Sequence, residues 1–320
     1  MKKVFIDGSA GTTGLRIRER LSDRKDLEMI WLTEERRKDP AARKDAICEA
    51  DIVFLCLPDD AARESVSLAA GSDTVIIDTS TAHRTSEGWI YGFPEIGGRR
   101  EQICQSGRIA NPGCHASGFI ALAAPLVQAG AVSSEAKLSC FSLTGYSGGG
   151  KKMIADYEGD QPQAAAAQPE PSHELLLSGP RMYGLSQSHK HLPEMAKVSG
   201  LASEPVFCPI VGNFYAGMEV VVPLFAEDLS VGIEQIREIY RDYYREGSGL
   251  VRYAEHPDES GFLSAAAFAG RDDMQVSVYG NEERIILVSR FDNLGKGASG
   301  AAIQNMNLVM GVDEKTGLIV

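Results

Sequence analysis

The N-terminal quarter of the chain alternates between short apolar runs and longer polar stretches. The apolar runs lie at residues 3–7, 27–32, 52–57 and 74–78. Runs of this length, rich in Val, Ile and Leu, are typical of strands that are covered on both faces. Between them, Leu15, Ile17 and Leu21 stand among arginines, and a second helical stretch begins at Asp59. Strands that alternate with helices at this spacing predict an α/β fold with a parallel, doubly wound sheet.

The rest of the chain has a different pattern. Residues 119–124 form an apolar run that predicts a buried helix. Further strands are predicted at residues 137–144, 217–224, 275–279 and 285–291. Residues 161–172 are rich in Ala, Gln and Pro, which is typical of an irregular loop. With 320 residues, and about 150 residues to a typical domain, we expect two domains.

Composition and charge exclude several classes of protein and of partner. Apolar residues make up 43% of the chain and charged residues 24%, as in ordinary globular proteins. The formal net charge of −12, with no long basic run, argues against nucleic acid or an anionic membrane as a partner. The longest apolar stretch is too short to cross a bilayer, and the N-terminal apolar run is too short for a secretory signal. We therefore expect a cytoplasmic protein with a small-molecule ligand.

A glycine-rich turn follows the first predicted strand directly. It reads G-x-x-G-x-x-G over residues 8–14 and leads into the first predicted helix. In this setting the backbone can approach a pyrophosphate, which the N–H groups at the helix N-terminus bind. Because the spacing departs from G-x-G-x-x-G, a simple tight turn is the alternative. The residues expected to bind a dinucleotide here are Gly8, Gly11, Thr12, Thr13 and Gly14.

Two further positions are expected at the same edge of the sheet. Pro58 follows the third predicted strand, and Ser80 follows the fourth. Doubly wound folds bind their ligands at the carboxyl ends of the parallel strands. Both residues are therefore predicted to line the dinucleotide site.

The segment after the second predicted strand bears on the choice of dinucleotide. At this place an acidic side chain accepts a hydrogen bond from the ribose 2′-hydroxyl of NAD, whereas a nearby arginine accommodates the 2′-phosphate of NADP. The chain carries Arg36, Arg37 and Lys38 here, and three consecutive cations favour NADP. Glu34 and Glu35 could equally balance these charges in a solvated turn.

One of the six cysteines stands in a setting that favours chemistry. Cys114 follows a Pro-Gly turn and precedes the apolar helical run, so a helix N-terminus would stabilise its thiolate. The absence of a C-x-x-C pair predicts neither a zinc site nor a disulfide framework, and no metal site is expected. The other cysteines fall in strand-like or helical runs and are expected to be core thiols: Cys48, Cys56, Cys104, Cys140 and Cys208.

A cysteine nucleophile needs a proton partner within hydrogen-bond reach. His189 and His191 stand two residues apart, which places both on one face of an extended segment. Glu194 follows closely and could orient one of them. We take these three residues as candidate partners of the thiol. A polar surface loop is the alternative.

A second glycine-rich segment follows the strand predicted at residues 137–144. Residues 145–152 come within one residue of the loop G-x-x-x-x-G-K-[ST], but Lys152 occupies the position where a hydroxyl must bind magnesium. This argues against a nucleoside triphosphatase. Ser147 and Lys151 offer a hydroxyl and an ammonium group to the carboxylate or phosphate of a smaller substrate. A flexible solvated turn is again the alternative.

Taken together, these segments resemble the short-chain N-acetyl-γ-glutamyl-phosphate reductases of the semialdehyde dehydrogenase superfamily. Where this family has a tyrosine, then proline or alanine, then threonine after the nucleophile, the chain has His115, Ala116 and Ser117. His115 adds a second possible proton carrier beside the thiol. The matching blocks are residues 8–14, 78–84 with 91–95, 111–114 (NPGC), 189–194 (HKHLPE), 211–214 with 217–218, and 292–300 with 304–305.

The resemblance implies how the chain is organised. Residues 1–115 would form a Rossmann-type dinucleotide-binding domain, completed by residues 292–320, whose C-terminal helix returns to it. Residues 116–291 would form an α+β catalytic and dimerisation domain with a large, antiparallel-leaning sheet. Asn293 would lie near the nicotinamide. The expected assembly is a homodimer or a homotetramer.

The resemblance also implies a reaction. Cys114 would attack an acyl phosphate and form a thioester, which NADPH reduces to a semialdehyde in arginine biosynthesis, with His189 or His191 as the base. Arg84, Ser147 and Lys151 would bind the carboxylate or phosphate of the substrate. Three alternatives differ in substrate or class: an enzyme acting on aspartyl phosphate, a catalytically dead NADP-sensing regulator, and a cysteine hydrolase. The regulator would need no thiol, and the hydrolase leaves the glycine turn unexplained.

Overall fold

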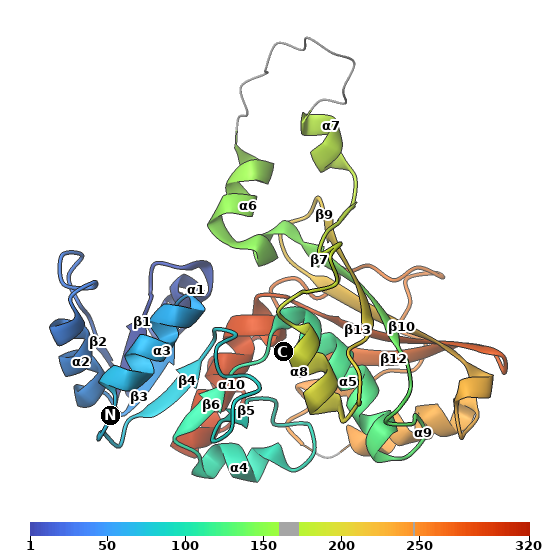
Figure 1. Ribbon diagram of the computed structural model, residues 1–320, viewed down its shortest axis with the longest axis horizontal. Helices are drawn as coiled ribbons and strands as arrows, with labels where there is room; N and C mark the ends of the chain where they lie inside the picture. Colours follow the sequence, from blue (N-terminus) through green and yellow to red (C-terminus); the bar gives the residue numbers. More distant parts are fainter. Residues whose placement is uncertain (160–172, 246) are drawn as a thin grey trace.

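The structure is a computed structural model that describes residues 1–159, 173–245 and 247–320 (Figure 1). The predicted loop at residues 161–172 lies outside the described residues. The described chain forms two β-sheets, one from its N-terminal third and one from the remainder. None of the described helices has the length and apolar composition that crossing a bilayer requires.

The first sheet is fully parallel, in the strand order β2-β1-β3-β4-β6-β5. This confirms the α/β fold that the alternating pattern predicts. The strands predicted at residues 27–32 and 52–57 end early, at Ile30 and Leu55. The six strands are β1 (Lys2–Asp7), β2 (Leu27–Ile30), β3 (Ile52–Leu55), β4 (Val75–Asp78), β5 (Ile90–Tyr91) and β6 (Arg108–Ala110).

Successive residues of a strand point to opposite sides of the sheet, so strands made of consecutive apolar residues give the sheet two apolar faces. Helices cover both of these faces. Val4 and Ile6 pack with Ile17 on one face, whereas Phe5 packs with Ile47 on the other. The first face is covered by α1 (Thr12–Leu21), α4 (Arg99–Gln105) and α10 (Gly300–Met310). The second face is covered by α2 (Pro40–Glu49) and α3 (Asp59–Leu68).

The second sheet is mixed, in the strand order β11-β12-β13-β10-β7-β9-β8. Only the β11–β12 and β7–β9 pairs are parallel, so the expected antiparallel-leaning sheet is confirmed. The apolar pattern does not predict β9, the parallel neighbour of β7. The strands are β7 (Ser139–Gly145), β8 (Arg181–Met182), β9 (Val206–Gly212), β10 (Met218–Phe225), β11 (Val251–Tyr253), β12 (Met274–Gly280) and β13 (Arg284–Phe291).

One face of the second sheet is covered by helices. These are α5 (Cys114–Gln128), α8 (Leu192–Ser199) and α9 (Ile233–Tyr243), with Phe119, Met195 and Tyr240 buried beside Val220 of the sheet. The opposite face carries large apolar side chains that remain 42% to 58% exposed, namely Phe141, Val206, Phe225 and Ile286. Two short helices, α6 (Gly150–Glu158) and α7 (His173–Ser178), project away from the body (Figure 1).

The C-terminal segment joins the two sheets. A π-helical turn, η3 (Gly295–Ser299), follows β13 and leads into α10. Ala302, Ile303 and Met306 of α10 pack into the core of the first sheet, where Figure 1 shows α10 in red beside the cyan strands. The return of the C-terminal helix is therefore confirmed. The division into residues 1–115 with 292–320 and residues 116–291 stays a prediction.

Candidate active site

A cavity of about 550 Å³ is lined by loops that follow strands of both sheets. It brings several of the predicted cofactor residues together with the predicted nucleophile and histidines. Of the residues predicted from the sequence, its lining includes Gly11, Thr12, Thr13, Pro58, Ser80, Arg84, Cys114, Ser147, His189, His191 and Asn293. The others lie outside the lining: Gly8, Gly14, Arg36, Arg37, Lys151 and Glu194.

Gly8 and Gly14 shape the first glycine turn. Gly8 has a φ of 93°, and a Cβ on it would collide with the Cys56 carbonyl group. A Cβ on Gly14 would collide with the Gly8 carbonyl group. The Gly11 N–H donates to the Gly8 carbonyl oxygen at 3.0 Å, and α1 then begins at Thr12 without a side-chain cap. The first N–H groups of α1 are therefore open to an anion such as a pyrophosphate.

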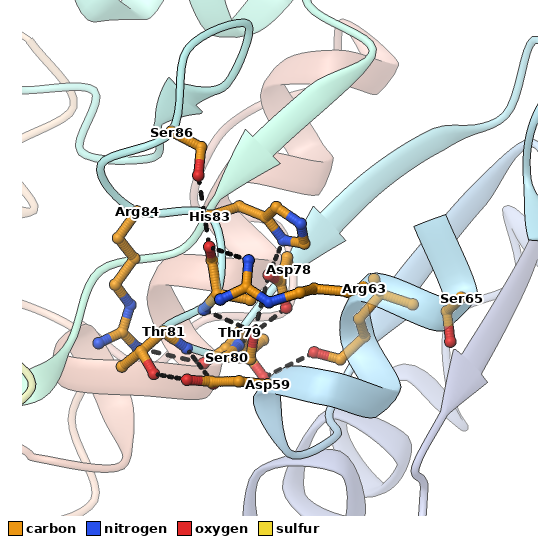
Figure 2. Close-up of polar contacts among 12 residues, drawn as sticks. Asp59, Arg63, Ser65, Asp78, Thr79, Ser80, Thr81, His83, Arg84 and Ser86 are labelled. Atoms are coloured by element: carbon orange, nitrogen blue, oxygen red, sulfur yellow. Dashed lines mark hydrogen bonds and ion pairs between the residues drawn. The ribbon is translucent and has the colours of Figure 1, made fainter. Parts of the chain in front are cut away.

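Two carboxylates hold the loop after β4 (Figure 2). Asp78 accepts hydrogen bonds from the Ser80 N–H at 2.9 Å and the Ser80 hydroxyl at 2.8 Å, and its Oδ2 lies 2.6 Å from Nδ1 of His83. Asp59, at the start of α3, accepts the Thr81 N–H at 3.0 Å and the Thr81 hydroxyl at 2.5 Å. The Ser80 hydroxyl is thus hydrogen-bonded within the loop. These hydrogen bonds fix the part of the loop that lines the cavity.

Cys114 is the first residue of α5, and Gly113 is the N-cap. Desolvation raises the pKa of the thiol although the residue is only half-buried, while the charge of Arg84, the backbone N–H of His115 and the charge of Lys190 lower it. The resting thiol is therefore protonated, and a base would have to take its proton before the sulfur could act as a nucleophile. A Cβ on Gly113 would collide with the ends of the Arg84, Glu194 and His191 side chains, so a larger residue here would displace them.

His189 and His191 lie just before α8 with their ring centroids 4.8 Å apart. His189 Nδ1 accepts the backbone N–H of His191 at 3.3 Å, whereas the buried Nδ1 of His191 has no hydrogen-bond partner. Burial lowers the pKa of both imidazoles, as do the charges of Arg84 on His191 and of Lys190 on both, so both rings are neutral and able to accept a proton. Within the described chain neither ring is hydrogen-bonded to Cys114, and such contacts commonly tighten only when substrate binds.

Glu194, on the first turn of α8, binds groups from the first sheet. Its side chain is buried, and Oε1 accepts a hydrogen bond from Nη1 of Arg84 at 2.8 Å. Oε2 accepts the Tyr91 hydroxyl at 2.6 Å and the Gly113 N–H at 3.2 Å. The closest approach to His191 is longer, 3.9 Å from Oε1 to Nε2. Glu194 therefore fixes Arg84 and the turn before Cys114 more directly than it orients an imidazole.

Asn293 and Ser147 form a second polar contact at the cavity. Asn293 Nδ2 donates to Oγ of Ser147 at 3.0 Å, and its Oδ1 accepts the Gly217 N–H at 2.9 Å. Both polar atoms of Asn293 are thus bound by protein, and no described residue accepts the proton of the buried Ser147 hydroxyl. Lys151 stands exposed on α6.

The cations predicted to bind a 2′-phosphate stand on an exposed segment after β2. Arg36 and Arg37 are both exposed, and Arg37 forms a 2.7 Å ion pair with Glu34. A further cation lies at the same end of β2, where the guanidinium carbon of Arg18 is 4.7 Å from the ring centroid of the exposed Trp31. Sequence reasoning missed Arg18 because a contact between residues on different elements leaves no local pattern.

The cavity lining also includes Tyr183 and Lys190, which the sequence prediction left out, and His115, which it raised as a second possible proton carrier. Lys190 stands between the two predicted histidines, and this position was a signal that could have identified it. Tyr183 follows the two-residue strand β8 and has no such signal. Among the described residues, no group of three or more His, Cys, Asp or Glu side chains could hold a metal ion.

The expectation that the other five cysteines are core thiols is wrong for Cys48 and Cys104, which are exposed. Cys48 follows the buried Ile47 on α2, and Cys104 follows the buried Ile103 on α4, so the helical period turns each sulfur outward. Cys140 is buried, and Cys56 and Cys208 are partly buried. All six cysteines are free.

Two family models match consecutive parts of the chain. Residues 37–106 match the NAD binding domain of semialdehyde dehydrogenases, and residues 114–293 match their dimerisation domain. Among curated relatives, N-acetyl-gamma-glutamyl-phosphate reductase 2 of Nostoc sp. is 43% identical over 99% of both chains. N-acetyl-gamma-glutamyl-phosphate reductase of Chelativorans sp. is 45% identical over 96% of this chain and 98% of its own.

Solved structures share the fold at low sequence identity. Aspartate semialdehyde dehydrogenase II of Vibrio cholerae matches with a TM-score of 0.71 at 17% identity, covering 97% of this chain and 98% of its own. Aspartate semialdehyde dehydrogenase of Candida albicans, solved with NADP, matches with a TM-score of 0.61 at 14% identity, covering 98% and 99%. The arrangement of the two sheets is therefore that of these enzymes.

Proposed function

The chain belongs to the N-acetyl-γ-glutamyl-phosphate reductases of the semialdehyde dehydrogenase family, and we propose that it reduces N-acetyl-γ-glutamyl phosphate to N-acetylglutamate semialdehyde with NADPH. It is an NAD(P)-dependent oxidoreductase of amino-acid biosynthesis. The observation that carries the proposal is one cavity that holds both Cys114, at a helix N-terminus, and the glycine turn before α1.

The residues of the first sheet fit a dinucleotide. A Cβ on Gly8 or Gly14 would fill the turn, and the uncapped N-terminus of α1 offers N–H groups to a pyrophosphate. Gly11, Thr12 and Thr13 would hold the phosphates, with Pro58 and Ser80 beside them. When bound, reduced nicotinamide supplies a hydride to an acyl carbon.

Acyl transfer to Cys114 is the first step that we propose. An imidazole of the His189–His191 pair takes the thiol proton, because both rings are neutral. The sulfur then bonds to the γ-carbonyl carbon, and the carbon–oxygen bond to phosphate breaks, leaving a thioester on Cys114. Phosphate departs as an anion and needs little protonation. The Arg84 charge lies close enough to lower the pKa of the thiol, and so also favours the attacking thiolate.

Release of the aldehyde returns the site to its resting state. After reduction, the imidazolium formed in the first step protonates the oxygen of the thiohemiacetal, or a water does so. The hydroxyl proton is lost again as the carbonyl forms and the carbon–sulfur bond breaks, and the departing Cys114 sulfur is reprotonated.

Our candidates for binding the substrate anions remain Arg84, Ser147 and Lys151. Arg84 lines the cavity, no described residue accepts the hydroxyl proton of Ser147, and Lys151 stands on the adjoining helix.

The reverse reaction tests the proposed function. With N-acetylglutamate semialdehyde, phosphate and NADP⁺, the protein should form reduced nicotinamide, which is followed by its absorbance. Omission of phosphate should stop the formation of acyl phosphate. A signal with aspartate semialdehyde and none with the acetylated aldehyde would replace the proposed substrate by aspartyl phosphate. No signal with either aldehyde would contradict the proposed activity.

Cofactor choice gives a separate prediction. If Arg36 and Arg37 bind a 2′-phosphate, replacing both by alanine should weaken NADPH binding by about 1.5–3 kcal/mol for each charged hydrogen bond lost. NADH binding should hardly change, and titration calorimetry measures both. Arg18→Ala is the matched variant, because Arg18 lies beside Trp31 at the same end of β2. If the Arg18→Ala variant alone loses its preference for NADPH, Arg18 and not the Arg36–Arg37 pair binds the 2′-phosphate.

We also propose that two copies of the chain associate through the open face of the second sheet. The exposed Phe141, Val206, Phe225 and Ile286 form an apolar surface within the segment that matches a dimerisation domain. Phe225→Asp or Ile286→Asp should weaken the dimer roughly tenfold or more in analytical ultracentrifugation. Phe262→Asp is the control, since Phe262 is 77% exposed but lies outside the sheet strands. Equal effects of all three variants would contradict this interface.

A further inference from the structure

His115 is a buried imidazole that the proposed mechanism does not use. It is the second residue of α5, directly after the nucleophile, and only 3% of its surface is exposed. Its ring contacts those of His189 and His191, with centroids 5.8 Å and 5.5 Å away, and that of Phe207 at 5.2 Å. A group in this position could be the base itself, or it could hold other groups in place.

The hydrogen bonds of His115 decide between these roles. Nδ1 lies 2.6 Å from the hydroxyl of Ser142, and Nε2 lies 2.6 Å from the hydroxyl of Tyr183. A neutral imidazole has one N–H and one lone pair, so it donates to one hydroxyl and accepts from the other. Neither nitrogen is left to receive the proton of Cys114. Burial also lowers the pKa of His115 to about 3, which keeps the ring neutral.

Tyr183, the hydrogen-bond partner of His115 Nε2, is itself a residue of the cavity lining. It follows β8 at the edge of the second sheet, where its N–H donates to the Pro209 carbonyl oxygen at 3.0 Å, and its ring packs on the edge of His189. Desolvation and the nearby Cys114 raise the pKa of Tyr183, so the phenol stays protonated. One position on its oxygen is used by His115, no other described residue is hydrogen-bonded to this oxygen, and Tyr183 lines the cavity.

We propose that His115 is a positioning residue, which holds the Tyr183 hydroxyl in the cavity as a hydrogen-bonding group for the acyl substrate. The inference rests on the proposed function. Tyr183 is assigned to the substrate because its ring packs on that of His189 and its hydroxyl meets His115, the residue directly after Cys114, so it stands beside the nucleophile. It therefore contributes to recognition of the acyl chain, and His115 acts through it.

Two substitutions of His115 test the contributions of its two ring nitrogens separately. Glutamine places its amide where Nε2 lies and can still contact Tyr183, whereas asparagine reaches only the position of Nδ1 beside Ser142. His115→Asn and Tyr183→Phe should each raise the KM for the acyl substrate roughly tenfold, with kcat and the KM for NADPH within about twofold. His115→Gln should recover most of the loss seen in His115→Asn. The double variant His115→Asn/Tyr183→Phe should be no worse than either single variant.

The outcomes distinguish this inference from its alternatives. Equal KM values for His115→Gln and His115→Asn, or a lower unfolding temperature with unchanged KM, would mean that His115 only packs the core. A displaced pH profile of Cys114 alkylation by iodoacetamide in His115→Gln would make His115 the base and overturn the proposal. If the unsubstituted protein converts neither aldehyde, the proposed function fails and this inference with it. If it does convert one, the comparison of Gln with Asn decides on His115 alone.

Discussion

Serine in place of Cys114 should leave the protein able to bind NADPH and acyl phosphate but unable to transfer the acyl group. The serine hydroxyl keeps the hydrogen bonding of the thiol but is far less acidic than a thiol, whose ordinary pKa is about 8.5. An imidazole therefore removes the proton of this hydroxyl far less readily than that of the thiol. We expect turnover to fall by a factor on the order of 10⁴ or more. Near-normal turnover would contradict covalent catalysis by Cys114.

The thioester itself should be observable in the unsubstituted protein. Given acyl phosphate without NADPH, the peptide containing residues 111–117 should gain the mass of the acyl group, and hydroxylamine should remove it. Cys48 and Cys104 are exposed and serve as internal controls, because iodoacetamide should reach them but the acyl phosphate should not label them. An adduct on any cysteine other than Cys114 would contradict covalent catalysis by Cys114, and hydride transfer directly to the acyl phosphate would then have to be considered.

The sequence was sufficient for those parts of the site that are local in the chain. The apolar runs at residues 3–7 and 52–57 predict β1 and β3 because both faces of these strands are buried under helices. The Pro-Gly turn before the apolar run at 119–124 predicts the helix that begins at Cys114. In each case the signal and the structure it specifies lie within a few residues of one another.

Contacts between distant segments could not be predicted in this way. Tyr183 meets His115 across 68 positions, and Asn293 meets Ser147 across 146. The exposure of Cys104 had a different cause, because a short helix that buries Ile103 turns the next residue to solvent. Sequence patterns record which face of an element is buried, whereas these pairings depend on how the elements pack.

Glu194 illustrates such a long-range dependence and gives the last prediction. Its carboxylate lies 110 positions from Arg84 in the chain, yet the two side chains form an ion pair that is almost fully buried. Arg84 also donates to the carbonyl oxygens of Asn111 at 2.9 Å and Thr79 at 3.1 Å. Without Glu194, Arg84 would keep these neutral acceptors but would be a buried cation without a counter-ion.

Glu194→Ala should therefore destabilise the fold by about 3–5 kcal/mol in chemical denaturation, because removing one partner leaves the other charge buried and unpaired. Tyr91→Phe removes one hydrogen bond to the same carboxylate and should cost about 1.5–3 kcal/mol. Lys197→Ala is the control on the same helix: its ammonium group makes an exposed contact with the Thr85 carbonyl oxygen, so the expected change is within about 0.5 kcal/mol. The released Arg84 and Gly113 would also misplace Cys114, so the thioester signal should fall in Glu194→Ala at temperatures where the variant is still folded. A Glu194→Ala variant as stable as the Lys197→Ala control would mean that the buried pair contributes nothing net to the fold.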